Sequence, residues 1–477
     1  EYCKSWWFNA RKAGLISLST PVLTAASDLQ SSDGGKDDYA MRSYFGRINY
    51  DYAGKYLFEA NVRMDGSSRF APGNRWGTFP SFSAAWRISE EAFWEDLKPI
   101  VDNLKIRASW GRLGNNGIGN YDWQNVYSPA NTSFGDAIQQ GVWTTAIANR
   151  DISWEKTDVV DLGLDVNLFG SLSLTFDYYN KLTHGILYRN PIPYVNGGLG
   201  APMINSAKVR NRGFEFSASY NKNFGDLGFA VSVNGAYNRN EIIDYKGDYL
   251  EINGATVWTE GQPIGKFYMR EIDHIVQDKA EIDKLVSEGW TFSPSRPEPG
   301  DFLYKDLNND KRIDDKDRVL KGQPLPLFTF GGSIAFSYKN FDLSALFSGV
   351  AGWDRYLSTG IFSLTNADTE RLFLKKFQNQ WLETNRNTNI PKLYASNEKN
   401  NQVSDYYLYD ASFLRLKTLQ LGYTLPKNLI PKVRIRAYCN LENYFTITSY
   451  PGMDPEMNGD VGYPILKTVS LGVNIKF

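Results

Sequence analysis

The most regular feature of the chain is an alternation of apolar and polar side chains with a period of two residues. From Val160 to Leu168 every second residue is Val or Leu, and the residues between them are Asp, Gly or Asn. Successive side chains of a β-strand point to opposite faces, so this pattern predicts a strand with one apolar and one polar face. The chain ends in the same way, from Thr468 to the aromatic carboxyl terminus Phe477.

Strands of this kind recur along the whole chain. We predict about thirteen, with a weaker strand before Thr20: 43–52, 55–64, 78–88, 104–110, 160–168, 171–178, 208–220, 229–238, 329–338, 341–348, 413–425, 433–443 and 468–477. Several apolar rows end in an aromatic residue, as in the girdles of membrane barrels: Tyr50, Tyr52, Tyr56, Trp86, Trp110 and Tyr423.

The connections between these strands are of two kinds. Reading back from Phe477, long connections over 446–466, 349–410, 239–327, 181–207 and 113–156 alternate with tight turns at Lys339, Asn221 and Phe169. One long connection, SEEAFWEDLKPIVDN after Ile88, falls on the side of the tight turns. The sequence therefore predicts an all-β, antiparallel transmembrane β-barrel with short periplasmic turns and long extracellular loops.

Composition removes several other classes. The mean hydropathy of the 477 residues is -0.42 and no run approaches the roughly 18 apolar residues of a membrane helix, which excludes a helical membrane protein. A net charge of -1 gives no reason to expect nucleic acid as a partner. Two histidines leave little room for His-based catalysis, and Cys3 and Cys439 form no zinc pattern. Cys439 is interpreted as a small apolar residue on its strand.

Six segments carry a resemblance that runs from about Tyr44 to Phe477. They resemble SusC/RagA-type TonB-dependent outer-membrane transporters in order and spacing: RINYDYAGKYLFEANVRMDGSSRF, RWGTFPSFSAAWRISEEAFW, LKIRASWGRLGNNGIGNY, ISWEKTDVVDLGLDVNLFGSLSLTFDYYNKLTHGILY, PGDFLYKDLNNDKRIDDKDR and FLRLKTLQLGYTLPKNL. The resemblance implies a protein of the bacterial outer membrane. It further implies TonB-driven import of a large nutrient, usually an oligosaccharide and less often a peptide, through a plugged barrel capped by a SusD-like surface lipoprotein.

The resemblance covers only the later part of such a transporter. We find no plug domain, TonB box or signal peptide, so residues 1–477 are expected to be the carboxyl-terminal part of the barrel, with TonB acting through the missing plug. Barrels of this class have 22 strands, and 13–14 strands would leave unpaired edges in lipid. A longer polypeptide or a second chain is expected to supply the rest.

One loop has the oxygen spacing of a Ca²⁺ site. Oxygen ligands at the EF-hand positions are offered by the side chains of Asp306, Asn308, Asp310, Asp314 and Asp317, with the carbonyl of Arg312. Lys311 replaces the usual turn glycine, and Asp317 replaces the longer glutamate. A structural Ca²⁺ in an extracellular loop is predicted, and a solvated, charged loop tip is the alternative.

Two further groups are candidates for contact with substrate. On the polar face of the strand 433–443 lie Arg434, Arg436, Tyr438, Asn440 and Glu442, which face substrate or plug, or pair with the charges of the wall. Aromatic residues of the loops, which stack on sugars or anchor the loops, are Tyr121, Trp123, Trp143, Trp154, Trp258 and Trp290. The segment 369–381 has near-helical apolar spacing and is predicted to be a loop helix packed on its neighbours.

The sequence does not predict an enzyme. It has no Gly-rich phosphate loop, no GxSxG motif and no plausible triad. A β-fold glycosidase would need a carboxylate pair across a cleft, which the sequence does not single out. The alternative to the transporter is a soluble or surface-attached β-rich glycan-binding protein, which would bury its apolar rows instead of exposing them to lipid.

Overall fold

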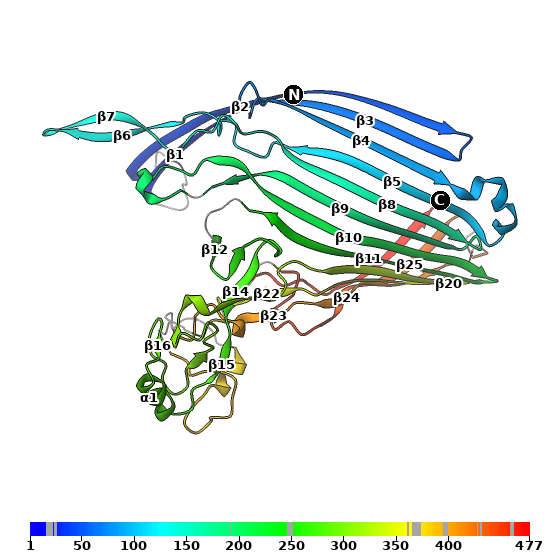
Figure 1. Ribbon diagram of the computed structural model, residues 1–477. Coiled ribbons are helices and arrows are strands. Elements are labelled where there is room, and N and C mark those ends of the chain that lie inside the picture. Colours follow the sequence, from blue (N-terminus) through cyan, green and yellow to red (C-terminus); the bar gives the residue numbers. More distant parts are fainter. Residues whose placement is uncertain are drawn as a thin grey trace.

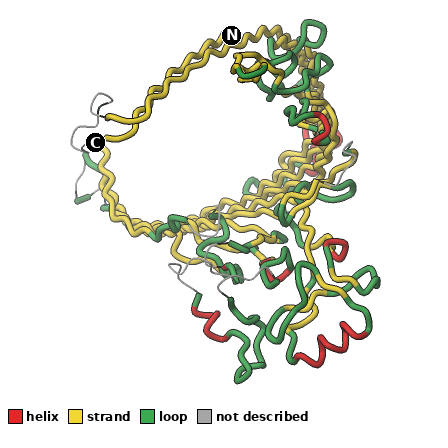
Figure 2. The backbone as a smooth tube through the Cα atoms, turned by 90° about the vertical axis from the view of Figure 1, so that its left-hand side faces the viewer, coloured by secondary structure: helices red, strands yellow, loops and turns green. Residues whose placement is uncertain are grey.

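One continuous antiparallel sheet of fourteen strands forms most of the structure (Figures 1 and 2). The computed structural model describes residues 1–15, 22, 26–190, 192–245, 251–359, 362–364, 374–394, 399–426, 428–429, 432–457 and 462–477. The strands follow one another in the sheet in chain order, and the sheet curves into a wall (Figure 2). A soluble sandwich would pack two sheets face to face, and the single curved sheet of the described residues does not have that architecture.

The strands of the sheet have these bounds, in sheet order: β1 (Tyr2–Leu15), β2 (Ala26–Tyr52), β3 (Tyr56–Ser67), β4 (Trp76–Arg87), β5 (Val101–Asn115), β8 (Glu155–Leu168), β9 (Leu172–Arg189), β10 (Met203–Phe224), β11 (Leu227–Asp244), β20 (Phe328–Tyr338), β21 (Phe341–Ala351), β24 (Phe413–Thr424), β25 (Arg434–Thr448) and β26 (Thr468–Lys476).

The other elements lie in the connections. Short strands are β6 (Tyr127–Phe134), β7 (Ala137–Thr144), β12 (Glu251–Asn253), β13 (Thr256–Trp258), β14 (Lys266–Arg270), β15 (Ile272–Ile275), β16 (Thr291–Phe292), β17 (Phe302–Tyr304), β18 (Arg312–Ile313), β19 (Arg318–Lys321), β22 (Asp354–Tyr356) and β23 (Leu408–Asp410). Helices are α1 (Lys279–Ser287) and the 3-10 helices at Ile88–Glu90, Ala92–Leu97, Tyr194–Asn196, Asp315–Asp317, Lys375–Asn379 and Asp405–Tyr407. None of the helices in the described ranges is long and apolar enough to cross a membrane.

Every predicted strand is part of the sheet, and the weaker one before Thr20 is β1. The predicted loops were too long in places, because the strands continue into them. β9 extends to Arg189 and β10 begins at Met203, so about half of the predicted loop 181–207 is a paired ribbon. Backbone pairing can continue after the alternation ends, because the outer ends of these strands no longer separate an apolar from a polar environment.

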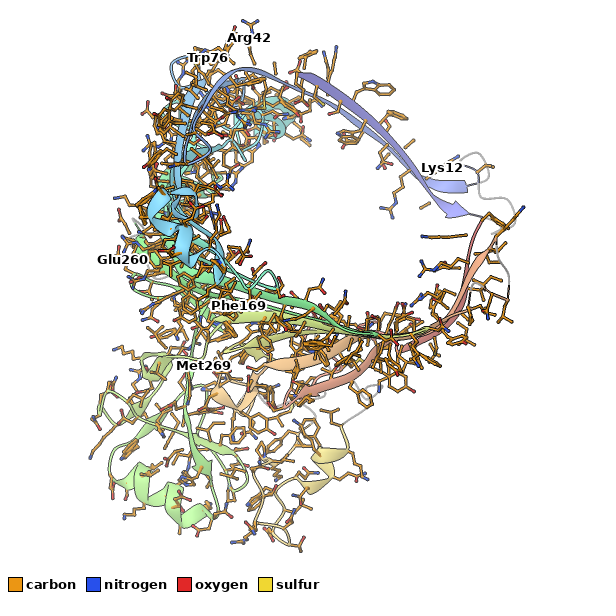
Figure 3. The ribbon with its side chains drawn as sticks, turned by 90° about the vertical axis from the view of Figure 1, so that its right-hand side faces the viewer. Lys12, Arg42, Trp76, Phe169, Glu260 and Met269 are labelled. Atoms are coloured by element: carbon orange, nitrogen blue, oxygen red, sulfur yellow. The ribbon has the colours of Figure 1, made fainter. Side chains whose placement is uncertain are left out.

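The register gives the sheet two chemically distinct faces. Residues that are directly opposite in neighbouring strands share a face, and Leu164, Phe176 and Phe216 form one such row. We call this the outer face and the opposite one, which carries Asp165, the inner face. Trp76 shares the outer face with Trp86 of the same strand, and Figure 3 shows it on the outside of the curved sheet.

The outer face exposes its apolar side chains. Leu162 is 51% exposed and Leu471 is 82% exposed, as expected of residues that face lipid and not a protein core. Tyr56 and Trp86 stack at the tight-turn end, with ring centroids 6.3 Å apart. Glu91 accepts hydrogen bonds from both rings, which attaches the long connection after Ile88 to this aromatic girdle.

Strand β2 has different partners along its length. Its first part, to Ala40, pairs with β1, and its second part, from Met41 to Tyr52, pairs with β3. Within the described residues, therefore, the second part of β2 has a strand partner on one side only. Tight turns such as that at Phe169 and Gly170, both with positive φ, join the strands at the opposite end from the loops.

Candidate functional site

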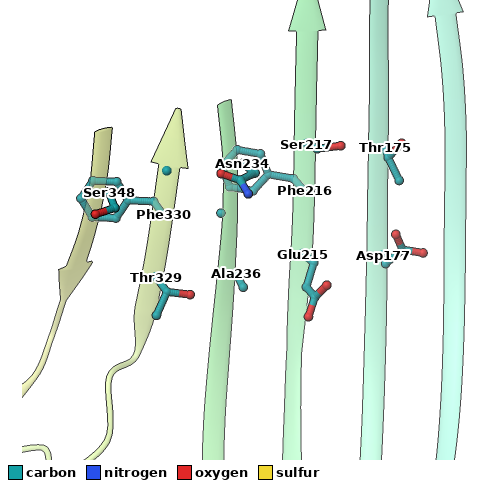
Figure 4. Close-up of a pocket in the computed structure, with 12 residues that line it drawn as sticks. Thr175, Asp177, Glu215, Phe216, Ser217, Asn234, Ala236, Thr329, Phe330 and Ser348 are labelled. Carbon is teal, nitrogen blue, oxygen red and sulfur yellow. The ribbon is translucent and has the colours of Figure 1, made fainter. Parts of the chain in front are cut away.

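The inner face of the sheet is hollowed over strands β9 to β21. The hollow, here called the inner groove, has a volume of about 540 Å³ (Figure 4). Its polar side chains come from five neighbouring strands and are Thr175, Asp177, Glu215, Ser217, Asn234, Thr329 and Ser348. Ala236 and Gly331 lie on the same face, and their small size leaves room above the sheet.

Two phenylalanines, Phe216 and Phe330, also line the groove, although their positions belong to the outer-face row. Phe216 and Phe330 flank Gly235 in the register row that contains Leu164 on the outer face. A Cβ on Gly235 would meet the ring of Phe216 at 2.7 Å, so the glycine provides the space in which this ring lies. The side chains that the inner face itself contributes to the groove are therefore mainly hydroxyl, amide and carboxylate groups.

An ion-pair network borders the inner groove. Arg107 makes two hydrogen bonds to Asp165, of 2.9 and 3.1 Å, and a third contact of 2.8 Å to Asp177. Lys105 lies 3.7 Å from Asp165. A second hollow of about 600 Å³ lies on the other side of this network, lined by Asn49, Glu59, Ser83, Lys105, Arg107, Ser109 and Asp161 among others. The network thus separates two polar hollows of one wall.

The charge of this part of the wall is negative. Lys105 and Arg107 face the four carboxylates of Asp161, Asp165, Asp177 and Glu215. In the described part of the chain, no lysine or arginine lies within ion-pair distance of Asp161 or Glu215. These two carboxylates can accept hydrogen bonds from a polar solute, and they favour cationic groups.

The predicted residues of β25 share the inner face but lie outside the groove. Arg436 pairs with Asp342 of β21 and donates to Gln420 at 2.8 Å, so it is part of the wall. Tyr438 lies beside Gly472 in the register, and Arg434 is exposed. This arrangement favours wall pairing for Arg436, and substrate contact by these three residues stays a prediction.

The predicted aromatic residues do not form a common platform. The hydroxyl of Tyr121 donates to the Asp38 carboxylate at 2.9 Å and thereby connects its loop to β2. Trp123 packs against a buried cluster that contains Trp154, and the guanidinium of Arg150 lies 5.9 Å from its ring. Trp143 lies exposed on the hairpin β6–β7. Sugar stacking by these residues remains a prediction.

The other two predicted tryptophans anchor connections. Trp258 lies against Tyr188 and Tyr245, at centroid distances of 6.0 and 6.2 Å. Trp290 packs on the core of the loop structure described next. Part of the predicted helix 369–381 lies outside the described residues, and the rest contains the short 3-10 helix Lys375–Asn379, whose Phe377 is buried.

Two long connections form one folded unit beyond the end of the strands (Figure 1). This outer lobe consists of the described residues within 251–327 and 352–412. Its buried core contains Ile275, Val276, Ile282, Phe302, Leu303, Tyr304 and Ile313 from the first connection, and Leu364, Phe377, Trp381, Ile390 and Tyr407 from the second.

Polar contacts join the two connections as well. Lys321 donates to Glu271 at 2.6 Å and to Asp405 of the second connection at 2.8 Å. Burial lowers the pKa of Lys321, but these hydrogen bonds outweigh the effect, and the net shift is upward. The hydrogen bond from Lys321 lowers the pKa of Glu271. Both shifts keep the groups charged, which stabilises the junction.

The predicted Ca²⁺ loop lies in the outer lobe. Asp306 accepts hydrogen bonds from the backbone of Asn309 and Lys311, at 2.7 and 2.9 Å. Lys311 has a φ of 61°, the conformation for which calcium loops use glycine. The fully buried Asp317 accepts from Leu307 at 2.9 Å. The loop is therefore compact.

The remaining predicted ligands take part in the same turns. Asn308 accepts from the backbone of Asp310, and Asp310 accepts from the backbone of Arg312, whose side chain pairs with Asp314. Over the ranges that the structure describes, no three His, Cys, Asp or Glu side chains are grouped so as to hold a metal ion. A Ca²⁺ site here remains a prediction.

Sequence reasoning missed Asp177, Glu215 and Asn234 as site residues. All three lie on the polar face of predicted strands, so their direction was predictable. The sequence instead favoured the polar face of β25 as a substrate contact, because charged residues are dense there. The available signal for the groove was different: small residues such as Ala236 and Gly331 on the polar face, which leave a hollow between strands.

Comparisons with known proteins agree with this architecture. The profile of a family described as "TonB dependent receptor-like, beta-barrel" matches residues 6–443. The chain is 34% identical to TonB-dependent receptor P3 of Formosa agariphila, over 91% of this chain and 45% of that protein. It is 31% identical to TonB-dependent receptor SusC of Bacteroides thetaiotaomicron, over 92% of this chain and 44% of that protein.

Solved structures give the same result. A structure described as that of the RagAB peptide transporter superposes with a TM-score of 0.80 at 28% identity, covering 96% of this chain and 50% of that one. A RagAB peptide importer in an open state gives a TM-score of 0.82 at 27% identity, over 100% of this chain and 51% of that one. The chain spans about half the length of the curated relatives it matches.

Proposed function

The chain belongs to the TonB dependent receptor-like β-barrel family, and from this premise we propose that the complete protein imports a large polar nutrient across the outer membrane. As a member of this family, the chain forms part of the wall of an outer-membrane barrel. Its exposed apolar outer face lies against lipid, and its polar inner face lines the lumen.

The observation that carries the proposal is the polar, hollowed inner face. The inner groove and the second hollow place carboxylate, amide and hydroxyl groups along the wall on both sides of Arg107. A wall of this kind can exchange hydrogen bonds with a hydrated solute at several successive positions. Such weak, repeated binding suits passage through a lumen better than one tight site would.

Two substrate classes follow from the resemblance, and the groove favours the second. The sequence suggested an oligosaccharide first, and sugar sites characteristically offer aromatic faces for stacking. The inner-face side chains offer carboxylates instead, and within the described residues no lysine or arginine lies within ion-pair distance of Glu215 in the groove or of Asp161 in the second hollow. We therefore propose a peptide substrate, whose amino groups these carboxylates can bind, with an oligosaccharide as the alternative. Similarity to RagAB, which is a peptide transporter, supports this choice.

The partners proposed for the complete protein are TonB and a SusD-like surface lipoprotein. TonB would act through a plug domain, which these residues do not contain. The outer lobe is the proposed contact for the lipoprotein, since it is a folded unit at the end of the strands where the long loops gather (Figure 1). Loops of this length suit a folded binding surface better than they suit simple tethers.

Purification of the complete receptor from outer membranes tests the proposal directly. We expect a surface lipoprotein to copurify, and we expect mixed peptides to bind more tightly than mixed oligosaccharides in calorimetric titrations. Glu215→Gln should weaken peptide binding about tenfold, as expected for the loss of one charge-assisted hydrogen bond. Val233→Ala on the outer face of the adjacent strand is the matched control. Uptake that persists in cells without TonB would contradict the import mechanism.

A further inference from the structure

Strand β10 shows where the apolar band of the outer face ends. Between Lys222 and Arg212, the outer-face positions hold Tyr220, Ala218, Phe216 and Phe214. This stretch of about ten residues has the length of a tilted β-strand across the hydrocarbon core. Lys222 lies toward the tight turn, so Arg212 marks the boundary on the side of the long loops.

Strand β11 repeats the boundary in register. Tyr237 lies opposite Phe214 on β10, and their rings stack with centroids 5.4 Å apart. The next outer-face pair is Arg239 opposite Arg212, and the one after it is Glu241 opposite Arg210. Arg210, Arg212 and Arg239 therefore form a cluster directly above the apolar band, which we call the arginine band.

The positive charge of the arginine band is mostly uncompensated. Arg212 has one distant ion pair, 3.9 Å from Glu241, and within the described residues no carboxylate lies within ion-pair distance of Arg210 or Arg239. The Nε of Arg210 is buried and has no hydrogen-bond partner in that part of the chain. Arg112, on the same face of β5, is different, because it makes two hydrogen bonds to Asp158. A buried donor without an acceptor is costly, so a ligand that supplies oxygen atoms would stabilise it.

We propose that the arginine band binds the phosphate-bearing headgroup of a lipid in the outer leaflet. The planar guanidinium groups match phosphate oxygens, and within the described residues Arg210 and Arg239 have no carboxylate within ion-pair distance, Glu241 being the one acidic residue in these outer-face pairs. The stacked rings of Phe214 and Tyr237 lie just below, where they can pack against the first part of the acyl chains. A free phosphate ion would bind only the arginines and would make no contact with the apolar faces of Phe214 and Tyr237, so the aromatic pair favours a lipid over free phosphate. This site depends on the membrane location of the barrel and not on what the barrel imports.

Titration of the complete, detergent-purified receptor tests the site. The probes are lipid A, chemically dephosphorylated lipid A and inorganic phosphate, with binding measured by native mass spectrometry. We expect lipid A to bind to the receptor. Each of the single variants Arg210→Gln, Arg212→Gln and Arg239→Gln should weaken this binding about fivefold. Dephosphorylated lipid A should bind with the same affinity to the unmodified receptor and to the triple variant Arg210→Gln, Arg212→Gln, Arg239→Gln.

The control is Lys222→Gln, which removes a cation from the same face of the same strand at the other membrane boundary. It should leave the affinity for lipid A unchanged. Heat-modifiable migration on gels reports folding, and if the triple variant does not fold, the single variant Arg239→Gln provides the same comparison. Equal affinity of phosphorylated and dephosphorylated lipid, unchanged binding by the folded variants, or full competition by inorganic phosphate would each overturn the lipid assignment.

Discussion

Arg107 of β5 and Asp177 of β9 form an ion pair across the intervening strand β8, with 2.8 Å between Nη2 and Oδ1. Gly163 lies between them in the register, on the same face. A Cβ at Gly163 would lie 2.4 Å from Oδ1 of Asp177 and 2.5 Å from Cζ of Arg107. The glycine therefore makes room for a contact that spans two strand spacings.

The first prediction is that Gly163→Val destabilises the barrel by about 1–3 kcal/mol, since it forces both charged side chains off their positions. Denaturant unfolding of the complete protein measures the change. Gly46→Ala is the control, because a Cβ at Gly46 meets its nearest neighbour only at 4.0 Å. Equal losses in the two variants would show that the ion pair does not depend on the glycine.

The second prediction concerns the two faces of β8. Leu164→Arg should cost about 2–4 kcal/mol if Leu164 lies near the bilayer midplane, because it places a charge in lipid. Asp165→Arg, one residue away on the inner face, should be far better tolerated in the same folding assay in lipid vesicles. Equal tolerance of both substitutions would contradict the assignment of the faces.

The third prediction concerns the last long loop. Arg415 is fully buried on the inner face and pairs with Asp454 and Glu456 of that loop. Arg415→Leu should lower the free energy of unfolding by about 2 kcal/mol. This is less than the loss expected for a wholly buried ion pair, because both carboxylates keep some contact with water. It should also make the loop more sensitive to protease. Lys417→Gln, which removes a more exposed partner of Glu456, is the control and should change neither.

The fourth prediction concerns pH. Burial lowers the pKa of His274, but hydrogen bonds to Asp273 and Glu281 outweigh it, and the net shift is upward. A raised pKa gives stability that is present at low pH and is lost as the pH rises through the folded-state value. Hydrogen exchange in α1, which contains Glu281, should therefore be slower at pH 6 than at pH 8 after correction for intrinsic rates. His274→Gln should abolish the difference, and a variant that keeps it would exclude this histidine as the cause.

The fifth prediction is that the loop from Asp306 to Asp317 binds Ca²⁺. Elemental analysis of the purified protein should find calcium, and chelator should increase protease cleavage in this loop. The double variant Asp306→Asn, Asp310→Asn should be cleaved equally with and without chelator while the barrel stays folded. Absence of calcium together with unchanged cleavage would leave the backbone hydrogen bonds to Asp306 as the sole role of this carboxylate.

The sequence was sufficient to predict the strands, because their signal is local. Each strand separates lipid from lumen, so its own residues must alternate, as Leu164 and Asp165 do. The inner groove was not predictable in the same way. Asp177 and Glu215 become neighbours only through the register of β9 and β10, and that register is set by pairing along the whole length of both strands.

The outer lobe was not predictable for a related reason. Its halves are separated in the chain by β20 and β21, and each half read alone is a long polar connection with scattered apolar residues. The buried contact between Asp301 and Asn400 joins residues that are 99 positions apart. No periodicity within either half indicates that the two halves share a core.

The composition of this core from two separate connections also couples the lobe to the wall. The hairpin β20–β21 brings the ends of the two halves together, so its formation shortens the loop that must close before the halves share a core. The state of the lobe is therefore sensitive to the pairing of the strands beneath it.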